Sequence, residues 1–462
     1  MKKVIALLLA LVLAFSLIAC GENSSTDNPS NSETNDSATG DSTTGDSGTD
    51  TPSADNSGDT IKIGVLTYMS SARSATMAFF QIGWEAAAEE FNAAGGIDGK
   101  NIEFILYDPQ NDAAQVSQCL TDAKNDGCVA ALFALGDDLA PTAAEWADAN
   151  QFPVALQSNT STELTIKHYS NYIFNVGPNA WSFAKILADA AVGREGKTNF
   201  VFCGTDGAAT IDAENLLILE GQKINPSFTM LNSYRVSADD SEFSNIIANI
   251  ASTAPDMVLQ QGGGPTFVAF AQQGNMFGLF NVSDVYNDFV VDTSTNSPLA
   301  ETGEFPYGHT KGIFLLNFWD KSAMDENIAG FCDNYMNNPL TTQNGYVAPS
   351  DSGLSCYRGV KAIALGIQAC VDAGIDYTDS QALAEAIAGI SWTDSTGEHV
   401  FRELDHQLTF DVYYGVSTDE NSEAYGGNPL AADIITYSAA DVLPTKQEMA
   451  DYAATLGVTD RF

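Results

Sequence analysis

Basic side chains are scarce in this chain. It has 19 Lys and Arg residues against 60 Asp and Glu residues among 462, which gives a formal net charge of −41 at pH 7. Nucleic-acid binding depends on clustered Lys and Arg that neutralise phosphates, and adhesion to anionic lipid depends on similar basic clusters. We therefore expect no nucleic acid among the partners, and no direct binding of the protein surface to an anionic membrane.

Sequence motifs for catalysis are also missing. The chain has no HExxH, no GxSxG and no GxxxxGK followed by Ser or Thr. Its four histidines, His168, His309, His399 and His406, are widely separated. This argues against a histidine-based metal centre or an activated nucleophile. We expect a protein that is not an enzyme and that carries no metal and no cofactor.

Cysteine pairs with CxxC spacing are absent as well. The six cysteines beyond Cys20 are Cys119, Cys128, Cys203, Cys332, Cys356 and Cys370. If the chain is exported, Cys119 and Cys128 are the best placed for a local disulfide, and free thiols remain the alternative. Cys356 and Cys370 fall on one expected helix, about 21 Å apart along its axis, which is too far for a bond.

The N-terminus has the pattern of an export signal. Two lysines, Lys2 and Lys3, precede an apolar run over 4–19 that is short for a membrane span. The run ends Leu17-Ile18-Ala19-Cys20, which resembles the lipobox of bacterial lipoproteins. That resemblance implies a signal peptide over 1–19, cleavage before Cys20 and lipidation of its thiol, which gives stable anchoring when two or more acyl chains are present. An ordinary secretory signal and an uncleaved anchor helix are the alternatives.

The next segment, 20–59, is expected to be a disordered acidic tether behind the lipidated cysteine. Residues 21–59 contain no aromatic, no Leu, Ile or Val and no basic residue, whereas Ser, Thr, Asp, Asn and Gly dominate. Such a composition cannot bury a core. A flexible coil of this length has an r.m.s. reach of roughly 35 Å.

About 400 residues remain, more than a single core usually holds, so we expect two lobes. No apolar stretch in them approaches 18 uncharged residues, so none should span a membrane. Strands are expected at 61–66, 102–107, 129–134, 154–156, 199–203, 256–260, 288–291 and 312–318. Helices are expected at 79–94, 113–125, 141–150, 180–192, 212–222, 242–252, 266–277, 324–335 and 353–373. This alternation predicts parallel, doubly wound sheets.

Several motifs follow one another in a familiar order. They are 61–66 with Ser70, 89–100, 107–112, 241–243 with 254–256, 357–367, and Thr396-Gly397-Glu398 leading to Phe401. From residue 60 to about 416 the chain resembles the type I periplasmic binding proteins of ABC importers, in particular the branched-chain amino-acid and amide binding, leucine-binding protein-like group. The resemblance implies a small-molecule ligand and an ABC permease as partners.

The same resemblance implies two α/β lobes, each with a doubly wound parallel sheet, joined by hinge strands and holding the ligand between them. We expect one lobe over 60–177 and 318–408, and the other over 178–317 and 409–440. Residues 441–462 would form a C-terminal extension. Ligands of open α/β sheets bind at the carboxyl ends of the strands.

The first ligand-holding loop would follow the first strand. The resemblance places Tyr68, Ser70 and Arg73 there, with Ser71 and Thr76, at the mouth of the cleft. A solvated loop without a ligand role is the alternative.

After the third strand the chain departs from the family pattern. Small residues and serines that receive a carboxylate are usual there, but this chain has Asp137 and Asp138. Asp138 could simply cap the helix that contains Pro141. If Asp137 faces the cleft, it favours a cationic or amide-bearing ligand group and repels a carboxylate.

The next ligand loop aligns with 157–165. There Ser158 would offer backbone contacts and Thr160 a hydroxyl, unless Thr160 and Glu163 only form a capping box. In the second lobe the alignment reaches Asp206, with no aromatic beside it, and Gln261, whose side chain could supply an amide. The acid that would hold an amino group falls near Asp292, with the register uncertain by one step.

Together these features predict an extracytoplasmic lipoprotein on the outer face of the cell membrane. It would capture a small polar solute, an amino acid or amide-like compound, and deliver it to an ABC importer. The alternative is a ligand-sensing module that reports to a membrane receptor. An extracellular enzyme comes third, because the chain lacks catalytic motifs.

Overall fold

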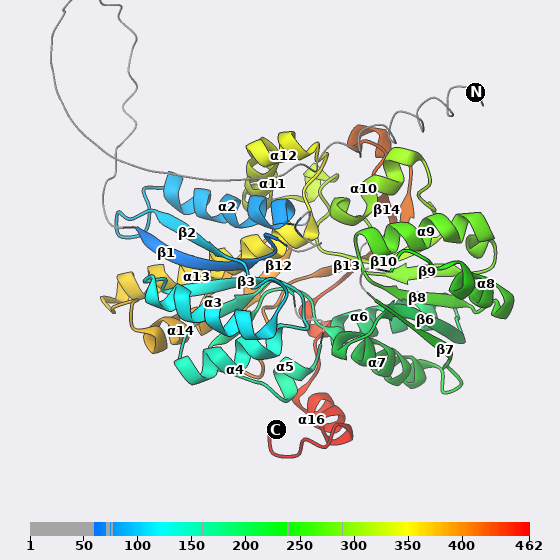
Figure 1. Ribbon diagram of the computed structural model, residues 1–462, viewed down its shortest axis with the longest axis horizontal. Helices are drawn as coiled ribbons and strands as arrows, with labels where there is room; N and C mark the ends of the chain where they lie inside the picture. Colours follow the sequence, from blue (N-terminus) through cyan, green and yellow to red (C-terminus); the bar gives the residue numbers. More distant parts are fainter. Residues whose placement is uncertain (1–59, 71–73, 75–76, 159–160, 238–239, 289) are drawn as a thin grey trace, which may run out of the picture. The chain divides into compact units, whose positions relative to one another are not determined.

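The computed structural model describes residues 60–462 except 71–73, 75–76, 159–160, 238–239 and 289 (Figure 1). The expected signal peptide, Cys20 and the tether therefore lie outside the described residues. Two sheets with helices on both faces dominate this part of the chain. No helix in it is long and apolar enough to cross a membrane.

The first sheet is entirely parallel and has the order β2-β1-β3-β4-β5. Its strands are β1 (Ile61–Thr67), β2 (Ile102–Tyr107), β3 (Ala130–Ala134), β4 (Val154–Leu156) and β5 (Ile173–Asn175). The central strand β3 is buried at every residue, which explains its unbroken apolar sequence, because helices cover both of its faces. The strand order reverses between β1 and β3, and ligands of doubly wound sheets bind at such a switch point.

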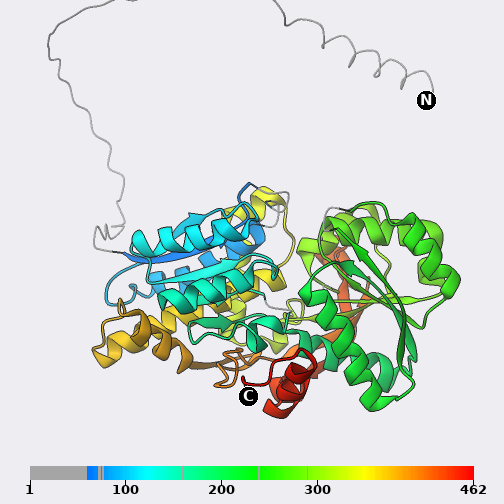
Figure 2. The same ribbon diagram turned by 60° about the horizontal axis from the view of Figure 1, so that its bottom comes forward.

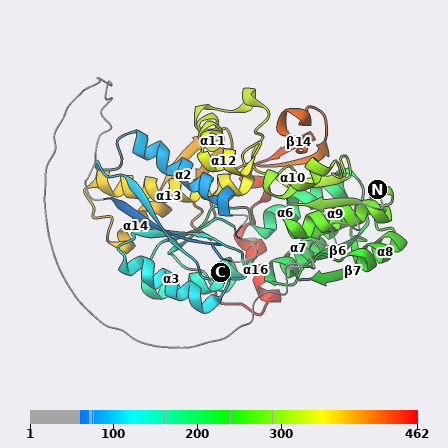
Figure 3. The same cartoon turned by 45° about the horizontal axis from the view of Figure 1, so that its top comes forward.

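Helices cover the two faces of this sheet separately (Figures 1 and 3). One face carries α2 (Met77–Ala93), α11 (Glu326–Asn337), α12 (Pro339–Asn344), α13 (Asp351–Ala373) and α14 (Ser380–Ala388). The other face carries α3 (Ala113–Asn125) and α4 (Ala140–Asn150), followed by the short α5 (Glu163–Ile166). Because α11 to α14 come from the C-terminal third, the chain returns to the first lobe after building the second, as expected.

The second sheet has the order β14-β13-β10-β9-β8-β6-β7. Its strands are β6 (Asn199–Thr205), β7 (Thr229–Val236), β8 (Met257–Gln261), β9 (Asp284–Asn287), β10 (Thr310–Phe314), β13 (Val412–Thr418) and β14 (Leu430–Tyr437). Five of them are parallel to one another, β13 runs antiparallel to its neighbour β10, and β14 pairs antiparallel with β13. The doubly wound parallel sheet expected for the second lobe is confirmed, and the strands β13 and β14 extend it at one edge with antiparallel pairing. A separate hairpin consists of β11 (Ser391–Asp394) and β12 (Gly397–Val400).

Helices also cover both faces of the second sheet. One face carries α6 (Ala180–Leu187), continued by a π-helical turn (Ala188–Arg194), and α7 (Ala208–Ile224). The other carries α8 (Ser244–Thr253), α9 (Pro265–Phe277) and α10 (Thr293–Thr302). The chain ends in α15 (Ala439–Val442) and α16 (Lys446–Thr455).

Most expected elements are confirmed, and three differences have physical reasons. The edge strand β7 was missed because its half-exposed side chains lack a regular alternation. The strand expected at 288–291 lies four residues earlier, at β9, because Val290 and Val291 pack in a separate cluster with Phe314. The local disulfide was also wrong, since Cys119 and Cys128 are free thiols.

Three segments cross between the two sheets, at 176–179, 315–325 and 401–411. Gln407 joins the first and the last. Its amide nitrogen donates to the carbonyl oxygen of Gly177 at 2.8 Å, and its side-chain oxygen accepts from Asn175 and from Asn179, the latter at 3.3 Å. Gln407 is fully buried, so these bonds replace water for every polar atom of its side chain.

The helices α2 and α13 approach so closely that their contact admits only glycine at two positions. A Cβ atom on Gly83 would lie 2.1 Å from the carbonyl oxygen of Gly353, and one on Gly353 would lie 3.0 Å from the carbonyl oxygen of Phe79 in α2. Backbone atoms cannot yield as a flexible side chain can, so any side chain at Gly83 forces the helices apart.

We predict that Gly83→Ala lowers the free energy of unfolding by about 1–3 kcal/mol, the usual cost of overpacking. Gly330→Ala in α11 is the matched control, because a Cβ atom there meets nothing within 4 Å. It should raise stability by up to about 1 kcal/mol through helix propensity. Urea unfolding measures both variants, and equal stability of the two would show that the helices can separate at no cost.

Candidate functional site

The loops that follow β1 and β3 meet at the switch point of the first sheet. Tyr68 is buried, and its hydroxyl oxygen accepts a hydrogen bond from the backbone N–H of Gly136 at 2.6 Å. Ser70 is exposed and donates its hydroxyl proton to Asp108. Arg73 lies outside the described residues. Two of the three residues expected in this loop are thus at the carboxyl end of the sheet, with Tyr68 fixing the neighbouring loop.

The two aspartates after β3 have different surroundings. Asp138 is exposed, and α4 begins after Leu139 without a side-chain cap, so the interpretation of Asp138 as a helix cap was wrong. Asp137 is partly buried, and its charge raises the pKa of Asp288 in the second lobe. Asp137 therefore acts across the two lobes.

The loop after β4 is held by a residue of the second lobe. Ser158 is partly buried, and Thr160 lies outside the described residues. Glu163 forms an ion pair with Lys167 at 2.8 Å and is the first residue of α5, directly after Thr162. The alternative of a capping box between Thr160 and Glu163 involves a residue outside the described ones.

Asp212 of α7 supplies the contact across the lobes. Its Oδ2 accepts from the backbone N–H of Thr162 at 2.7 Å and from the Thr162 hydroxyl at 2.9 Å. Sequence reasoning missed Asp212, because nothing in the local pattern of α7 indicates that this residue faces another lobe.

The second-lobe candidates separate into an exposed residue and two buried ones. Asp206 follows β6 and is exposed, whereas Gln261 ends β8 with 8% of its surface exposed. Both lie where the strand order reverses between β6 and β8. Asp292 is 2% exposed, and its carboxylate accepts the hydroxyl of Ser350, at the start of α13, at 3.3 and 3.4 Å.

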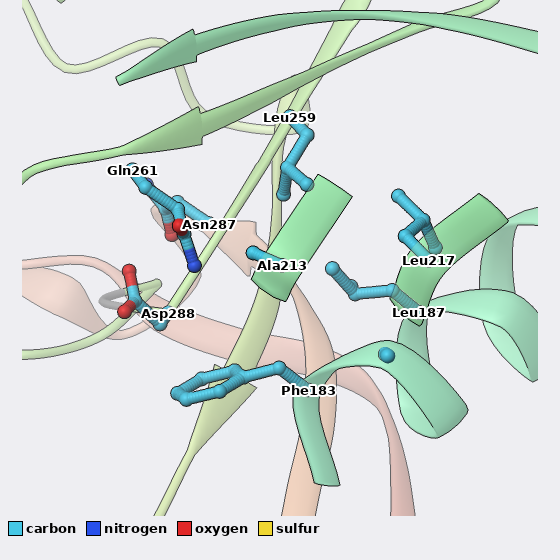
Figure 4. A pocket seen from close by; sticks show the side chains of 9 residues that line it. Phe183, Leu187, Ala213, Leu217, Leu259, Gln261, Asn287 and Asp288 are labelled. Atoms are coloured by element: carbon cyan, nitrogen blue, oxygen red, sulfur yellow. The ribbon is translucent and has the colours of Figure 1, made fainter. Parts of the chain in front are cut away.

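A pocket opens beside Gln261 at the carboxyl ends of β8 and β9 (Figure 4). Its polar side consists of Gln261, Asn287 and Asp288, which Figure 4 shows gathered together. Its apolar side consists of Phe183, Ala184, Leu187, Ala213, Leu217 and Leu259. The side chains of α6 and α7 thus form the apolar wall, and the ends of two strands form the polar one.

Asp288 is the residue of this pocket that sequence reasoning missed. The four-residue error in the position of β9 placed Asp288 at the start of a strand, whereas it directly follows the carboxyl end of one. The available signal was the polar pair Asn287 and Asp288 between two apolar runs, which marks the end of a strand.

Comparison with known proteins agrees with this geometry. The family model described as "Periplasmic binding protein" matches residues 60–421. The chain belongs to the periplasmic binding protein family. No curated protein sequence matches it.

Solved structures of this fold resemble the chain closely despite low identity. A Brucella ovis protein that binds leucine, isoleucine, valine, threonine and alanine, in a closed conformation, has a TM-score of 0.70 at 16% identity, covering 88% of this chain and 99% of its own. An R. palustris ABC transporter solute-binding protein in complex with 4-hydroxybenzoate has a TM-score of 0.69 at 17% identity, with 82% and 97% coverage. A Streptococcus pneumoniae branched-chain amino acid transporter substrate-binding protein in complex with isoleucine has a TM-score of 0.63 at 18% identity. The alignment covers 82% of this chain and 100% of that protein.

Negative charge is concentrated at the site of this periplasmic binding protein. Burial raises the pKa of Asp288 to about 7, and the carboxylates of Asp137 and Asp292 add to the shift. Burial and the charge of Asp292 likewise raise the pKa of Asp351 to about 8, although Arg358 and a hydrogen bond from the backbone N–H of Leu315 oppose this. Perturbed carboxyl groups of this kind gather at functional sites.

No group of three or more His, Cys, Asp or Glu residues within the described part of the chain is arranged to hold a metal ion. The same described part contains free thiols at Cys203, Cys356 and Cys370, all buried, so they are not presented to a ligand. The groups that the site offers are therefore carboxylates, amides and an apolar wall.

The raised pKa of Asp288 predicts a pH-dependent stability. The folded carboxyl binds its proton more tightly than the unfolded one, so folding loses stability as the pH rises from about 4 to about 7. Asp288→Asn removes this loss, and we expect it to raise stability at pH 8 by on the order of 1–3 kcal/mol, with little change at pH 4.5.

Thermal unfolding from pH 4.5 to 8 measures this difference. Glu301→Gln, which removes one charge from an exposed position of α10, is the control and should follow the parent chain at every pH. If the stability of Asp288→Asn and that of the parent chain change with pH in the same way, the Asp288 carboxyl titrates with an ordinary pKa.

Proposed function

We propose that this protein is an extracytoplasmic solute-binding lipoprotein that captures a small polar solute between its lobes and delivers it to an ABC importer. The observation that carries the proposal is a direct contact between the lobes beside the strand ends: Asp212, in the helix that follows β6, accepts from the backbone N–H of Thr162, in the loop after β4, at 2.7 Å. Loops at the carboxyl ends of both sheets thus face a common site, as binding between two doubly wound lobes requires.

The crossing segments support a division into two lobes that move as units. We assign 60–177 with 318–408 to one lobe, 178–317 with 409–440 to the other, and 441–462 to a C-terminal extension. Gln407 fixes two crossings to each other, so closure would bend the backbone next to it rather than within a sheet. A ligand drives closure only if it binds the closed form better.

The ligand-holding residues of this proposal come from both lobes. In the first they are Tyr68, Ser70, Arg73, Asp137, Asp138, Ser158 and Thr160, and in the second they are Asp206, Gln261 and Asp292. The structural neighbours bind amino acids or hydroxybenzoates. Their ligands are small and polar, which supports the same size class here.

We predict that the purified chain binds one such solute at a single site. A thermal-shift screen of amino acids, amides and short peptides at millimolar concentration should contain at least one ligand that stabilises it by about 2.7 kcal/mol at 100 times Kd. Recovery of that solute unchanged after incubation distinguishes binding from catalysis. A screen without any stabilising member would contradict the proposed function.

The lipid anchor is a separate part of the proposal and rests on the lipobox-like end of the signal, Leu17-Ile18-Ala19-Cys20. A chain held by acyl groups on a tether of about 40 residues would stay within roughly 35 Å of the membrane and therefore near its permease.

We predict that Cys20→Ser abolishes membrane attachment when the full chain is expressed in a lipidating bacterial host. The parent chain should partition into the detergent phase of a Triton X-114 separation, because its acyl chains bury apolar surface there. Cys332→Ser should partition in the same way and is the matched control. If Cys20→Ser also enters the detergent phase, the apolar run itself anchors the chain.

A further inference from the structure

We infer that the solute of this binding protein is a cationic amine, held by Asp288 and Gln261 and lacking a free carboxylate. This inference rests on the proposed function, since it assumes that the site between the lobes is the solute site. It goes further by assigning the charge of the solute.

The polar wall of the lobe-2 pocket includes two acceptors that lack a donor, beside the amide of Asn287, which can both donate and accept. The Oδ1 atom of Asp288 and the Oε1 atom of Gln261 are both buried and have no hydrogen-bond partner among the described residues. Gln261 is 92% buried, and Figure 4 shows its side chain beside Asp288 at the pocket. A buried acceptor without a donor is unfavourable, so the wall fits a ligand group that carries several N–H donors.

The charges around this wall have one sign. The charged groups that act on Asp288 are Asp137, from the loop after β3, and Asp292, which precedes α10. Asp351, at the start of α13, is in turn acted on by Asp292 and by the buried Arg358. Arg358 lies over the ring of Phe410 and donates from Nη2 to Thr396, and its charge acts on Asp394 and Asp351.

A carboxylate in this position would add a further negative charge to a poorly solvated group of acids. Like charges at close range repel each other more strongly when water is excluded. A protonated amine is attracted by the same acids and donates to both Asp288 and Gln261. The ring of Phe183 lines the same pocket and offers a π-face of the kind that attracts ammonium groups.

The size of the cavity limits how much of the ligand enters it. Leu187, Leu217 and Leu259 are buried and face the polar side across the pocket. The cavity between the walls has a volume of about 10 Å³, enough for one group of the size of a water molecule or an ammonium. The chemical class is therefore a primary amine, with its ammonium group at the acids.

The titration of Asp288 makes the inference testable without any variant. An amine binds the ionised carboxylate, and the pKa of that carboxyl is about 7 in the free protein. Amine affinity should therefore be about tenfold lower at pH 6 than at pH 8, with a proton released on binding below pH 7. Isothermal titration in two buffers of different ionisation enthalpy measures that proton directly.

The decisive comparison uses probes that share a carbon skeleton. One series is 3-methylbutylamine, leucine and 4-methylpentanoate, and the second is 2-phenylethylamine, phenylalanine and 3-phenylpropanoate. We expect an amine to stabilise the full chain in at least one series, with the matching zwitterion and carboxylate at least tenfold weaker. Tighter binding of a zwitterion or a carboxylate overturns the inference but leaves the proposed function intact.

Two other outcomes of the same experiment overturn the inference. Binding by none of the amines, amino acids or carboxylates contradicts the proposed function as well. Stabilisation by Ca²⁺ or Mg²⁺ alone would assign the acids to a metal ion, since carboxylates are also the ligands that these ions prefer.

Asp288→Asn tests the assigned residue with little change in shape. It should weaken amine binding at pH 8 at least tenfold and remove the pH dependence between pH 6 and 8. Glu301→Gln removes the same formal charge from an exposed position and should bind as the parent does. Unchanged amine affinity in Asp288→Asn overturns the assignment. If this variant does not fold, the amine affinity of the parent chain at pH 6 and pH 8 tests the assignment instead, and equal affinity at the two pH values overturns it.

Discussion

The carboxylate of Asp212 is the contact on which the arrangement of both lobes depends. Asp212 belongs to α7 of the second lobe and is 4% exposed, yet it accepts from Thr162 of the first lobe and from the hydroxyl of Tyr452 in α16 at 2.7 Å. Hydrogen bonds to a buried charged acceptor contribute about 1.5–3 kcal/mol each. One side chain therefore joins the loop before α5, the helix α7 and the C-terminal helix α16. Figure 2 shows this last helix, in red, at the bottom of the view between the two lobes.

The C-terminal extension reinforces that contact instead of ending as a loose tail. On the second lobe, Glu448 of α16 pairs with Lys185 at 2.9 Å and with Lys223 at 3.0 Å. On the first lobe, the guanidinium of Arg461 lies 3.9 Å from the ring centre of Tyr169. Any change in the angle between the lobes would alter one of these contacts, so the extension would take part in the proposed closure.

The sequence was sufficient to predict an element where the pattern of residues depends on that element alone. The helix α3 has the predicted bounds because Asp112 caps it and its apolar face is regular, and the buried strand β3 is an unbroken apolar run. Tyr68 and Gln261 were also placed correctly, at the carboxyl ends of their strands. Asp212 could not be found, because its role depends on a partner in another lobe. Asp288 was missed because the apolar Val290 and Val291 drew the expected strand four residues too far along the chain, although the polar pair Asn287 and Asp288 marked its true end.

The acids that the two lobes bring to the site explain why a ligand would favour closure. Asp137 and Asp288 belong to different lobes, and their mutual repulsion favours separation of the lobes when nothing lies between them. A cation that enters the site reverses the sign of this interaction, because each carboxylate is then attracted to the same charge. The closed form gains most from that change, since it brings both carboxylates near the ligand, and this differential affinity is what a ligand needs to drive closure. The same acids that destabilise the empty site would thus make closure dependent on the solute.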